Sequence, residues 1–233
     1  MTKKFLLVFM TVFLLGACSA AIPNSNAPVP TTPQAALIQP DVPANTQAAP
    51  SLSVDEVYQA VSAAWKKQET AGPRHISQTT SEGLSIEADA VPPDFHQVVS
   101  AMGSVVAEQY IVGGTIYNNE QGSWTQTAGG GAALGVIGSF SLNLSGDLVY
   151  SNGMVNGIEV INGSPAILYS YSTTLKGLDA SAQYKLWVDQ TSGLPVKAEN
   201  TSPDGSIVTM IYTYDPSITI SLSSEAQNAP PSK

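Results

Sequence analysis

The side chains that could catalyse a reaction are few in this sequence of 233 residues. The only histidines, His75 and His96, fall beside predicted strands, and two histidines do not supply the three or four convergent ligands that a zinc site requires. The sequence has no Gly-x-Ser-x-Gly motif, and its glycines near 129–135 fit neither common phosphate-binding pattern. The acidic residues are scattered, so they indicate no paired-carboxylate site. We therefore expect a protein that is not an enzyme and that holds no cofactor and no metal.

Cys18 is the only thiol, and it follows a segment typical of secretory signals. Two lysines precede an apolar run over residues 5–15, which at about eleven residues is shorter than the ~20 that a membrane-spanning helix needs. Leu15-Gly16-Ala17-Cys18 resembles the lipobox of bacterial lipoproteins, in which the cysteine sulfur carries a diacylglycerol and becomes the mature N-terminus. We expect residues 1–17 to be a signal peptide and Cys18 to be the lipidation site.

The charge of the chain narrows the choice of partners. Cleavage before Cys18 would remove two lysines and no acidic residue, so the net charge of −9 would become −11. An acidic protein repels phosphate backbones and anionic headgroups, which argues against a nucleic-acid partner. The lipid would supply the contact with the membrane. The expected location is the cell membrane, with the chain lipid-anchored and extracytoplasmic, in the periplasm or on the outer surface.

Composition divides the mature chain into three parts. Residues 18–50 are rich in Pro and Ala with Asp41 as their only charge, which is typical of a disordered tether behind the lipid. Residues 224–233 are polar and contain two prolines, which predicts a disordered tail. Residues 51–223 are long enough for one domain with a substantial core.

That domain should begin with a helix. Ser53 and Glu56 have the spacing of a capping box, and apolar residues then recur at steps of three and four as far as Trp65. The pattern ends near Glu69, before Gly72-Pro73. A short second helix is expected within 129–144, where an apolar stripe runs through a glycine-rich segment.

Most of the remaining sequence alternates with a period of two between turn residues, as β-strands do. The predicted strands lie near 74–80, 84–90, 95–101, 107–117, 122–127, 156–161, 165–174, 181–189, 194–201, 205–214 and 217–221. Short turns between successive strands favour antiparallel pairing. Several strands carry more apolar residues than one buried face requires, so the sheet should curl around its helices, or around helices and a ligand.

Several segments carry a resemblance to a known family. They are Val91-Pro92-Pro93-Asp94-Phe95, the Trp187-Val188-Asp189 strand end followed by Gly193-Leu194-Pro195, and the closing Tyr214-Asp215-Pro216. In this order the chain resembles the lipoprotein-carrier superfamily, which groups LolA- and LolB-like lipoprotein chaperones with LppX- and LprG-like lipid-binding lipoproteins. The resemblance implies an α+β fold, in which a curved antiparallel sheet of about 10 to 11 strands forms an incomplete β-barrel. An N-terminal helix and a short middle helix would cover its concave face.

The same resemblance implies an apolar cavity for acyl chains. Alternation along the strands and the 129–144 segment selects its expected lining: Leu134, Ile137, Phe140, Leu144, Tyr110, Val112, Ile116, Tyr184, Leu186, Val188, Met210 and Tyr212. The chain would then bind or carry lipid, acyl chains or lipoproteins. The alternative is a sensor or scaffold lipoprotein of the same fold, whose shell is filled by its own helices and which acts through a protein partner.

Overall fold

The computed structural model describes residues 50–128, 148–175 and 181–232, which lie in one compact unit, Asn45–Lys233. Helix α1, Val54–Glu69, begins as the sequence predicts. The Ser53 N–H donates to the Glu56 carboxylate at 2.8 Å, and the Glu56 N–H donates to the Ser53 hydroxyl at 3.4 Å. This reciprocal capping box satisfies two backbone donors that the first turn would otherwise leave free. In the described part of the chain, neither helix has the length and apolar character needed to span a membrane.

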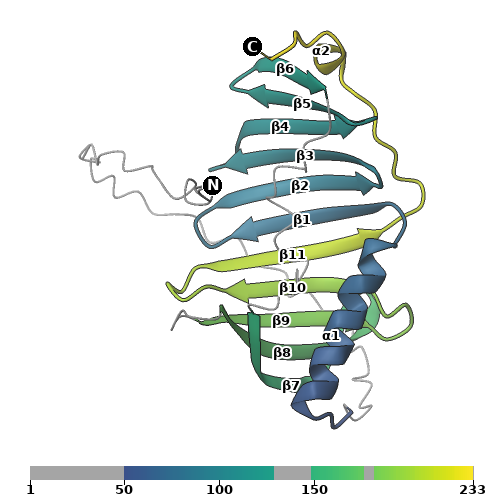
Figure 1. Ribbon diagram of the computed structural model, residues 1–233, viewed down its shortest axis with the longest axis vertical. Helices are drawn as coiled ribbons and strands as arrows, with labels where there is room; N and C mark the ends of the chain where they lie inside the picture. The colour runs from purple at the N-terminus through teal and green to yellow at the C-terminus, as the bar shows by residue number, and fades with distance from the viewer. Residues whose placement is uncertain (1–49, 129–147, 176–180, 233) are drawn as a thin grey trace, which may run out of the picture. The chain divides into compact units, whose positions relative to one another are not determined.

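Eleven strands form one antiparallel sheet (Figure 1). They are β1 Arg74–Thr80, β2 Leu84–Val91, β3 Asp94–Ala101, β4 Ser104–Val112, β5 Thr115–Glu120, β6 Ser123–Ala128, β7 Leu148–Ile161, β8 Ser164–Leu175, β9 Ser181–Asp189, β10 Pro195–Thr201 and β11 Ile207–Tyr214. Their spatial order is β6-β5-β4-β3-β2-β1-β11-β10-β9-β8-β7, so β6 and β7 are the two edges and the sheet is not closed. The predicted α+β half-barrel is confirmed.

Helix α1 lies across one half of one face of the sheet, over β7 to β11 (Figure 1). We call this the inner face and the opposite one the outer face. Val57, Val61 and Trp65 of α1 pack against inner-face residues such as Met210 and Tyr212, and all five are buried. This cluster is the core of the domain, and it leaves the helix anchored to one half of the sheet.

Three predicted strands differ from the structure. The strand expected near 156–161 begins eight residues earlier, since β7 spans Leu148–Ile161. The segment 107–117 is not one strand, because Gly113 and Gly114 form a tight turn between β4 and β5. Both glycines have positive φ, 57° and 77°, as the central residues of a type I′ hairpin do. The segment 217–221 forms no strand. The expected middle helix, in 129–144, lies outside the described residues.

The C-terminal tail, predicted to be disordered, is ordered in the structure. Residues Ser224–Gln227 form the short helix α2, capped by the Ser223 hydroxyl, and Ala226 and Ala229 are buried. The chain then runs beside the edge strand β6, where the Gln126 N–H donates to the Pro230 carbonyl at 2.9 Å. Small apolar side chains and backbone hydrogen bonds therefore hold a segment whose polar composition and prolines suggested disorder.

Candidate functional site

The residues predicted to line a cavity fall into three groups. Leu186, Val188, Met210 and Tyr212 do lie together on the inner face, but they pack against α1 and belong to the core. Tyr184 stands at the rim of this group, half-buried, with its ring stacked on Tyr171 at 5.2 Å. The helix thus fills the space that the sequence pattern assigned to a ligand.

The second group is split between the two faces. Tyr110 and Val112 lie on the outer face, where Tyr110 stacks on His96 with ring centroids 4.1 Å apart. Ile116 lies on the inner face, opposite Ile111. The prediction that these three residues share a face was wrong, because the Gly113-Gly114 turn reverses the chain between Val112 and Ile116. The third group, Leu134, Ile137, Phe140 and Leu144, and the lipidation site Cys18 lie outside the described residues.

The inner face of β3 to β5 is the part of the sheet that could hold a ligand. Helix α1 does not reach this area, which lies in the other half of the sheet (Figure 1), and the short helix α2 packs against β5 and the edge strand β6. Phe95, Val99, Ile111 and Ile116 point to it and are only half-buried. We call the surface made by these four residues and the amides between them the open inner face. A mostly apolar lining with a few polar groups is typical of small-molecule sites.

A row of amide side chains crosses this surface. The Gln97 amide donates to the Gln109 oxygen at 3.2 Å, and the Gln109 amide donates to the Asn118 oxygen at 2.7 Å. Gln97 and Gln109 are buried, and so is Gln78 on β1. The side-chain oxygens of Gln78 and Gln97 accept no hydrogen bond from a described residue. Buried acceptors without donors are costly, so a ligand with a hydroxyl or amide group would find partners here.

Arg74 stands where the open inner face meets the α1 core. It pairs with Tyr214 on β11 and with Ala90 on β2, and its side chain shares the inner face with Ile76. Burial raises the pKa of Tyr214 to about 12, while the hydrogen bond from Gln68 and the positive charge of Arg74 oppose this rise. The guanidinium therefore lies close to the Tyr214 hydroxyl.

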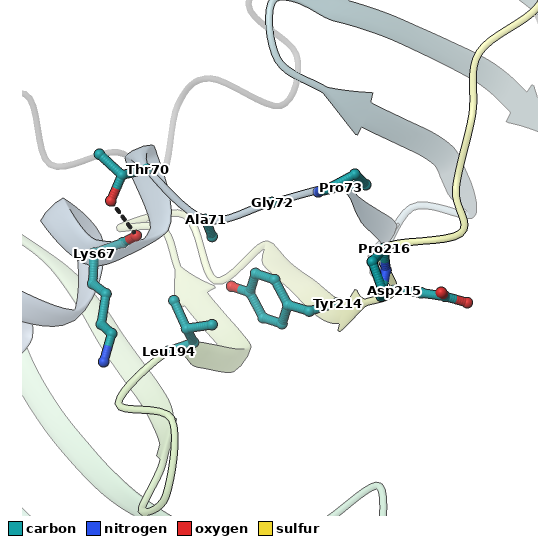
Figure 2. A pocket seen from close by; sticks show the side chains of 9 residues that line it. All are labelled: Lys67, Thr70, Ala71, Gly72, Pro73, Leu194, Tyr214, Asp215 and Pro216. Atoms are coloured by element: carbon teal, nitrogen blue, oxygen red, sulfur yellow. Dashed lines mark hydrogen bonds between the residues drawn. The ribbon is translucent and has the colours of Figure 1, made fainter.

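A pocket of about 320 Å³ opens beside Tyr214, at the C-terminal end of α1 (Figure 2). Its walls are mostly apolar and come from the α1–β1 connection, the β9–β10 turn and the end of β11. The lining residues are Lys67, Thr70, Ala71, Gly72, Pro73, Leu194, Tyr214, Asp215 and Pro216. The Asp215 carboxylate points away from the others (Figure 2) and accepts hydrogen bonds from Ser217. Lys67 is the other charged residue of this lining, and its ammonium lies beside Gly193 in the β9–β10 turn.

The outer face carries the two histidines, each held by carboxylates. His75 lies between Asp89, with Nδ1 to Oδ1 at 2.8 Å, and Glu87, with Nε2 to Oε2 at 2.9 Å. Nε2 of His96 is 2.9 Å from Glu108. These residues are spread along the four strands β1 to β4, and the described residues contain no group of three or more histidines, cysteines or carboxylates suited to a metal ion. The histidines act here as cross-strand links.

Sequence reasoning missed the amide row and the position of Arg74. A signal for the row was present: Gln97 lies between Phe95 and Val99 in the alternation of its strand, where an apolar residue would be expected. Gln109 could not be assigned in the same way, because 107–117 was treated as one strand.

Comparison with known proteins identifies the fold. No protein-family model matches the sequence, and no curated protein matches it. Among solved structures, the lipoprotein LppX of Mycobacterium tuberculosis aligns with a TM-score of 0.55 and 14% identity, over 72% of this chain and 99% of LppX. An uncharacterized conserved protein of Thermus thermophilus gives a TM-score of 0.42 at 10% identity, over 77% of this chain and 98% of its own. The MucA/MucB complex of Pseudomonas aeruginosa gives 0.37 at 13% identity, over 68% and 56%.

The likeness to LppX shows a common fold at low identity. It confirms, for the fold alone, the resemblance to LppX-like proteins that the sequence motifs suggested.

Proposed function

We propose that this chain is a lipid-anchored, extracytoplasmic lipoprotein that binds acyl chains, of a lipid or of a lipidated protein, on its open inner face. The observation that carries the proposal is the uneven cover of the inner face. One half is filled by α1, whereas Val99, Ile111 and Ile116 in the other half remain partly exposed, and Phe95, also half-buried, packs against the edge of the core. Burying such side chains fully is worth about 1.5 to 3 kcal/mol each, relative to leaving them in water.

Three further features support this proposal. The common fold with LppX supports it by analogy. The open inner face consists of apolar and amide side chains, which can bury a ligand but carry no reactive group. Such a lining suits binding rather than catalysis. The predicted lipidation at Cys18 would keep the binding domain beside the membrane from which an acyl chain is taken.

The test is a binding titration with matched variants on neighbouring residues. Ile111 and Val112 are adjacent on β4, are both half-buried and lie on opposite faces. The mature chain from Ser19 onward would be titrated with a fluorescent fatty acid. Ile111→Asn should weaken binding by roughly tenfold or more, because it removes apolar contact from the proposed site. Val112→Asn should leave binding unchanged.

Native mass spectrometry of the lipidated protein, purified in detergent, gives an independent measurement. A copurified lipid that is absent from Ile111→Asn and present in Val112→Asn would support the proposal. Equal binding by both variants would place the ligand elsewhere.

A protein-binding scaffold or sensor is the second candidate, and the packing of α1 favours it. The helix already fills half of the inner face with its own side chains, as expected for a shell that holds no ligand. The two candidates differ in one measurement: a scaffold would bind no fluorescent fatty acid and would copurify without lipid.

A further inference from the structure

Arg74 is the only lysine or arginine that a described strand places on the inner face. Its Nε and Nη1 atoms are buried and make no hydrogen bond or ion pair with a described residue. The lysines of β9 and β10 differ from Arg74, because both lie on the outer face and have partners there. Lys185 lies 2.8 Å from Glu199, and Lys197 lies over the ring of Trp187 at 4.2 Å.

The neighbouring carboxylates cannot neutralise Arg74. Glu87 and Asp89, on the adjacent strand β2, lie on the outer face, where both bind His75. Between Arg74 and Lys176 the sequence has no other lysine or arginine. A partly buried guanidinium without an anion is unfavourable, whereas its fork of N–H groups matches the oxygens of a carboxylate or a phosphate. Within residues 50–128, 148–175 and 181–232, the inner face therefore offers no anionic partner to Arg74.

The geometry points to Arg74 as the site that binds the anionic group of an acyl-chain ligand, a carboxylate or a phosphate. This inference rests on the proposed function, and it adds the chemical class of the ligand. Arg74, Ala90, Phe95, Ile111 and Ile116 follow one another in register across β1 to β5. With neighbouring strands about 4.8 Å apart, this row extends roughly 19 Å. A chain bound by its charged end at Arg74 would lie along the apolar part of the row.

The pocket beside Tyr214 is lined by the neighbours of Arg74 and not by Arg74 itself. Pro73, which precedes Arg74, and Tyr214, its partner on β11, both line that pocket. A headgroup larger than a bare carboxylate could thus extend from Arg74 toward Lys67, while the acyl chain runs in the opposite direction over β2 to β5. Ala90, between Arg74 and Phe95 in this row, is buried and presents only a methyl group.

The experiment compares ligands that share one acyl chain and differ in the headgroup. Dodecanoate, dodecyl phosphate, dodecanol and acetate would each compete with a fluorescent fatty acid for the mature chain at pH 7.5. We expect the two charged amphiphiles to bind at least about tenfold more tightly than dodecanol, since hydrogen bonds to a buried charge are strong. Acetate, which has the charge without the chain, should not compete.

Arg74→Gln removes the charge and keeps a polar side chain of similar length, and Lys66→Gln removes a charge from an exposed position on α1. Arg74→Gln should abolish the preference for charged amphiphiles and leave dodecanol binding unchanged, whereas Lys66→Gln should keep the preference. Without ligand, Arg74→Gln should unfold in urea at a midpoint no lower than that of the wild type, because it removes a partly buried charge that has no described partner.

Each of the following results would contradict one part of the inference or of the proposed function. Equal binding of dodecanol and dodecanoate by the wild type, or a preference that survives Arg74→Gln, would reject the inference while acyl binding stands. If acetate competed as strongly as dodecanoate, Arg74 would be a site for free anions. A large drop in the urea midpoint of Arg74→Gln would show that Arg74 is a structural residue. If neither dodecanol nor dodecanoate binds, the proposed function itself fails, and the inference fails with it.

Discussion

His75 links two carboxylates of the neighbouring strand, Asp89 and Glu87, and this arrangement requires a charged imidazolium. Only a protonated ring has an N–H on both nitrogens to donate to both carboxylates. Burial disfavours the charge, but the hydrogen bonds to Asp89 and Glu87 outweigh it, and together they raise the pKa of His75 above its ordinary value of 6.5. The folded protein therefore holds this proton more tightly than the unfolded chain does.

The consequence is a stability contribution that depends on pH. Because the pKa of His75 is raised on folding, its contribution to stability is fully present below the unfolded-state pKa near 6.5. This contribution is lost as the pH rises through the higher pKa of the folded state. The difference in unfolding free energy between the wild type and His75→Gln should thus be larger at pH 5.5 than at pH 8.5. The change should stay below about 1 kcal/mol, because the site is partly exposed to solvent. Urea unfolding at several pH values measures it, and parallel pH profiles would contradict the expectation.

Trp65 is the largest side chain that α1 contributes to the core. It is 5% exposed and meets Tyr212 edge to face, with ring centroids 6.1 Å apart. Trp65→Ala should lower the unfolding free energy by about 3 to 5 kcal/mol, the usual cost of an aromatic cavity. Lys66→Ala, at the adjacent exposed position, is the matched control and should change it by less than about 0.5 kcal/mol. Equal urea midpoints for the two variants would mean that α1 does not pack as described.

Among the elements, those with a local signal were predictable from the sequence. The capping box at Ser53 and Glu56 fixed the start of α1, and period-two alternation located most strands. The β4–β5 hairpin was missed because Val112 and Ile116, on either side of Gly113-Gly114, both fit one continuous alternation. Since a strand exposes opposite faces at successive residues, one unrecognised turn is enough to assign side chains to the wrong face.

The candidate site was less predictable than the fold, for a related reason. Alternation shows which residues share a face, but it does not show which part of that face a helix covers. Leu186 and Met210 fit a cavity lining and a core equally well, and only the position of α1 decides between them. The unpaired state of Arg74 depends on carboxylates that lie on the other face, which is a tertiary property.

The C-terminal tail shows how an element can be held by few contacts. Ala226 is fully buried, while the next residue, Gln227, is exposed. Ala226→Asp should release the tail from β5 and β6, because a buried carboxylate without a partner is strongly unfavourable. Gln227→Asp adds the same charge at the exposed position and should not.

Hydrogen exchange is the suitable measurement for the tail. The Gln126 amide, which donates to the Pro230 carbonyl, should exchange faster in Ala226→Asp than in Gln227→Asp. Amides of β1 and β11, in the middle of the sheet, should be affected far less. The same exchange rate at Gln126 in both variants would show that the tail does not depend on Ala226.

At the scale of the whole molecule, the chain carries its charge unevenly. Residues 75–175 contain no lysine or arginine. The charged side chains of strands β2 to β7 are therefore carboxylates, and His96 is the one histidine among these strands. Such a surface gives no electrostatic attraction to anionic headgroups. Attachment to a membrane would then depend on the lipid at Cys18, and the open inner face would receive acyl chains by burial and through the single cation Arg74.

Cys18→Ala tests this dependence. Two or three acyl chains contribute about 0.8 kcal/mol per buried methylene and give a stable anchor, whereas the acidic domain has no comparable attraction to the bilayer. The variant should therefore lose the mature membrane-bound form and appear as a soluble species or an unprocessed precursor. Membrane fractionation after a high-salt wash, with intact mass to detect the lipid, measures the outcome. Ser19→Ala is the control, since it changes the next residue without removing the thiol. Mature, cleaved Cys18→Ala that remains with the membrane would show that another part of the chain provides the anchor.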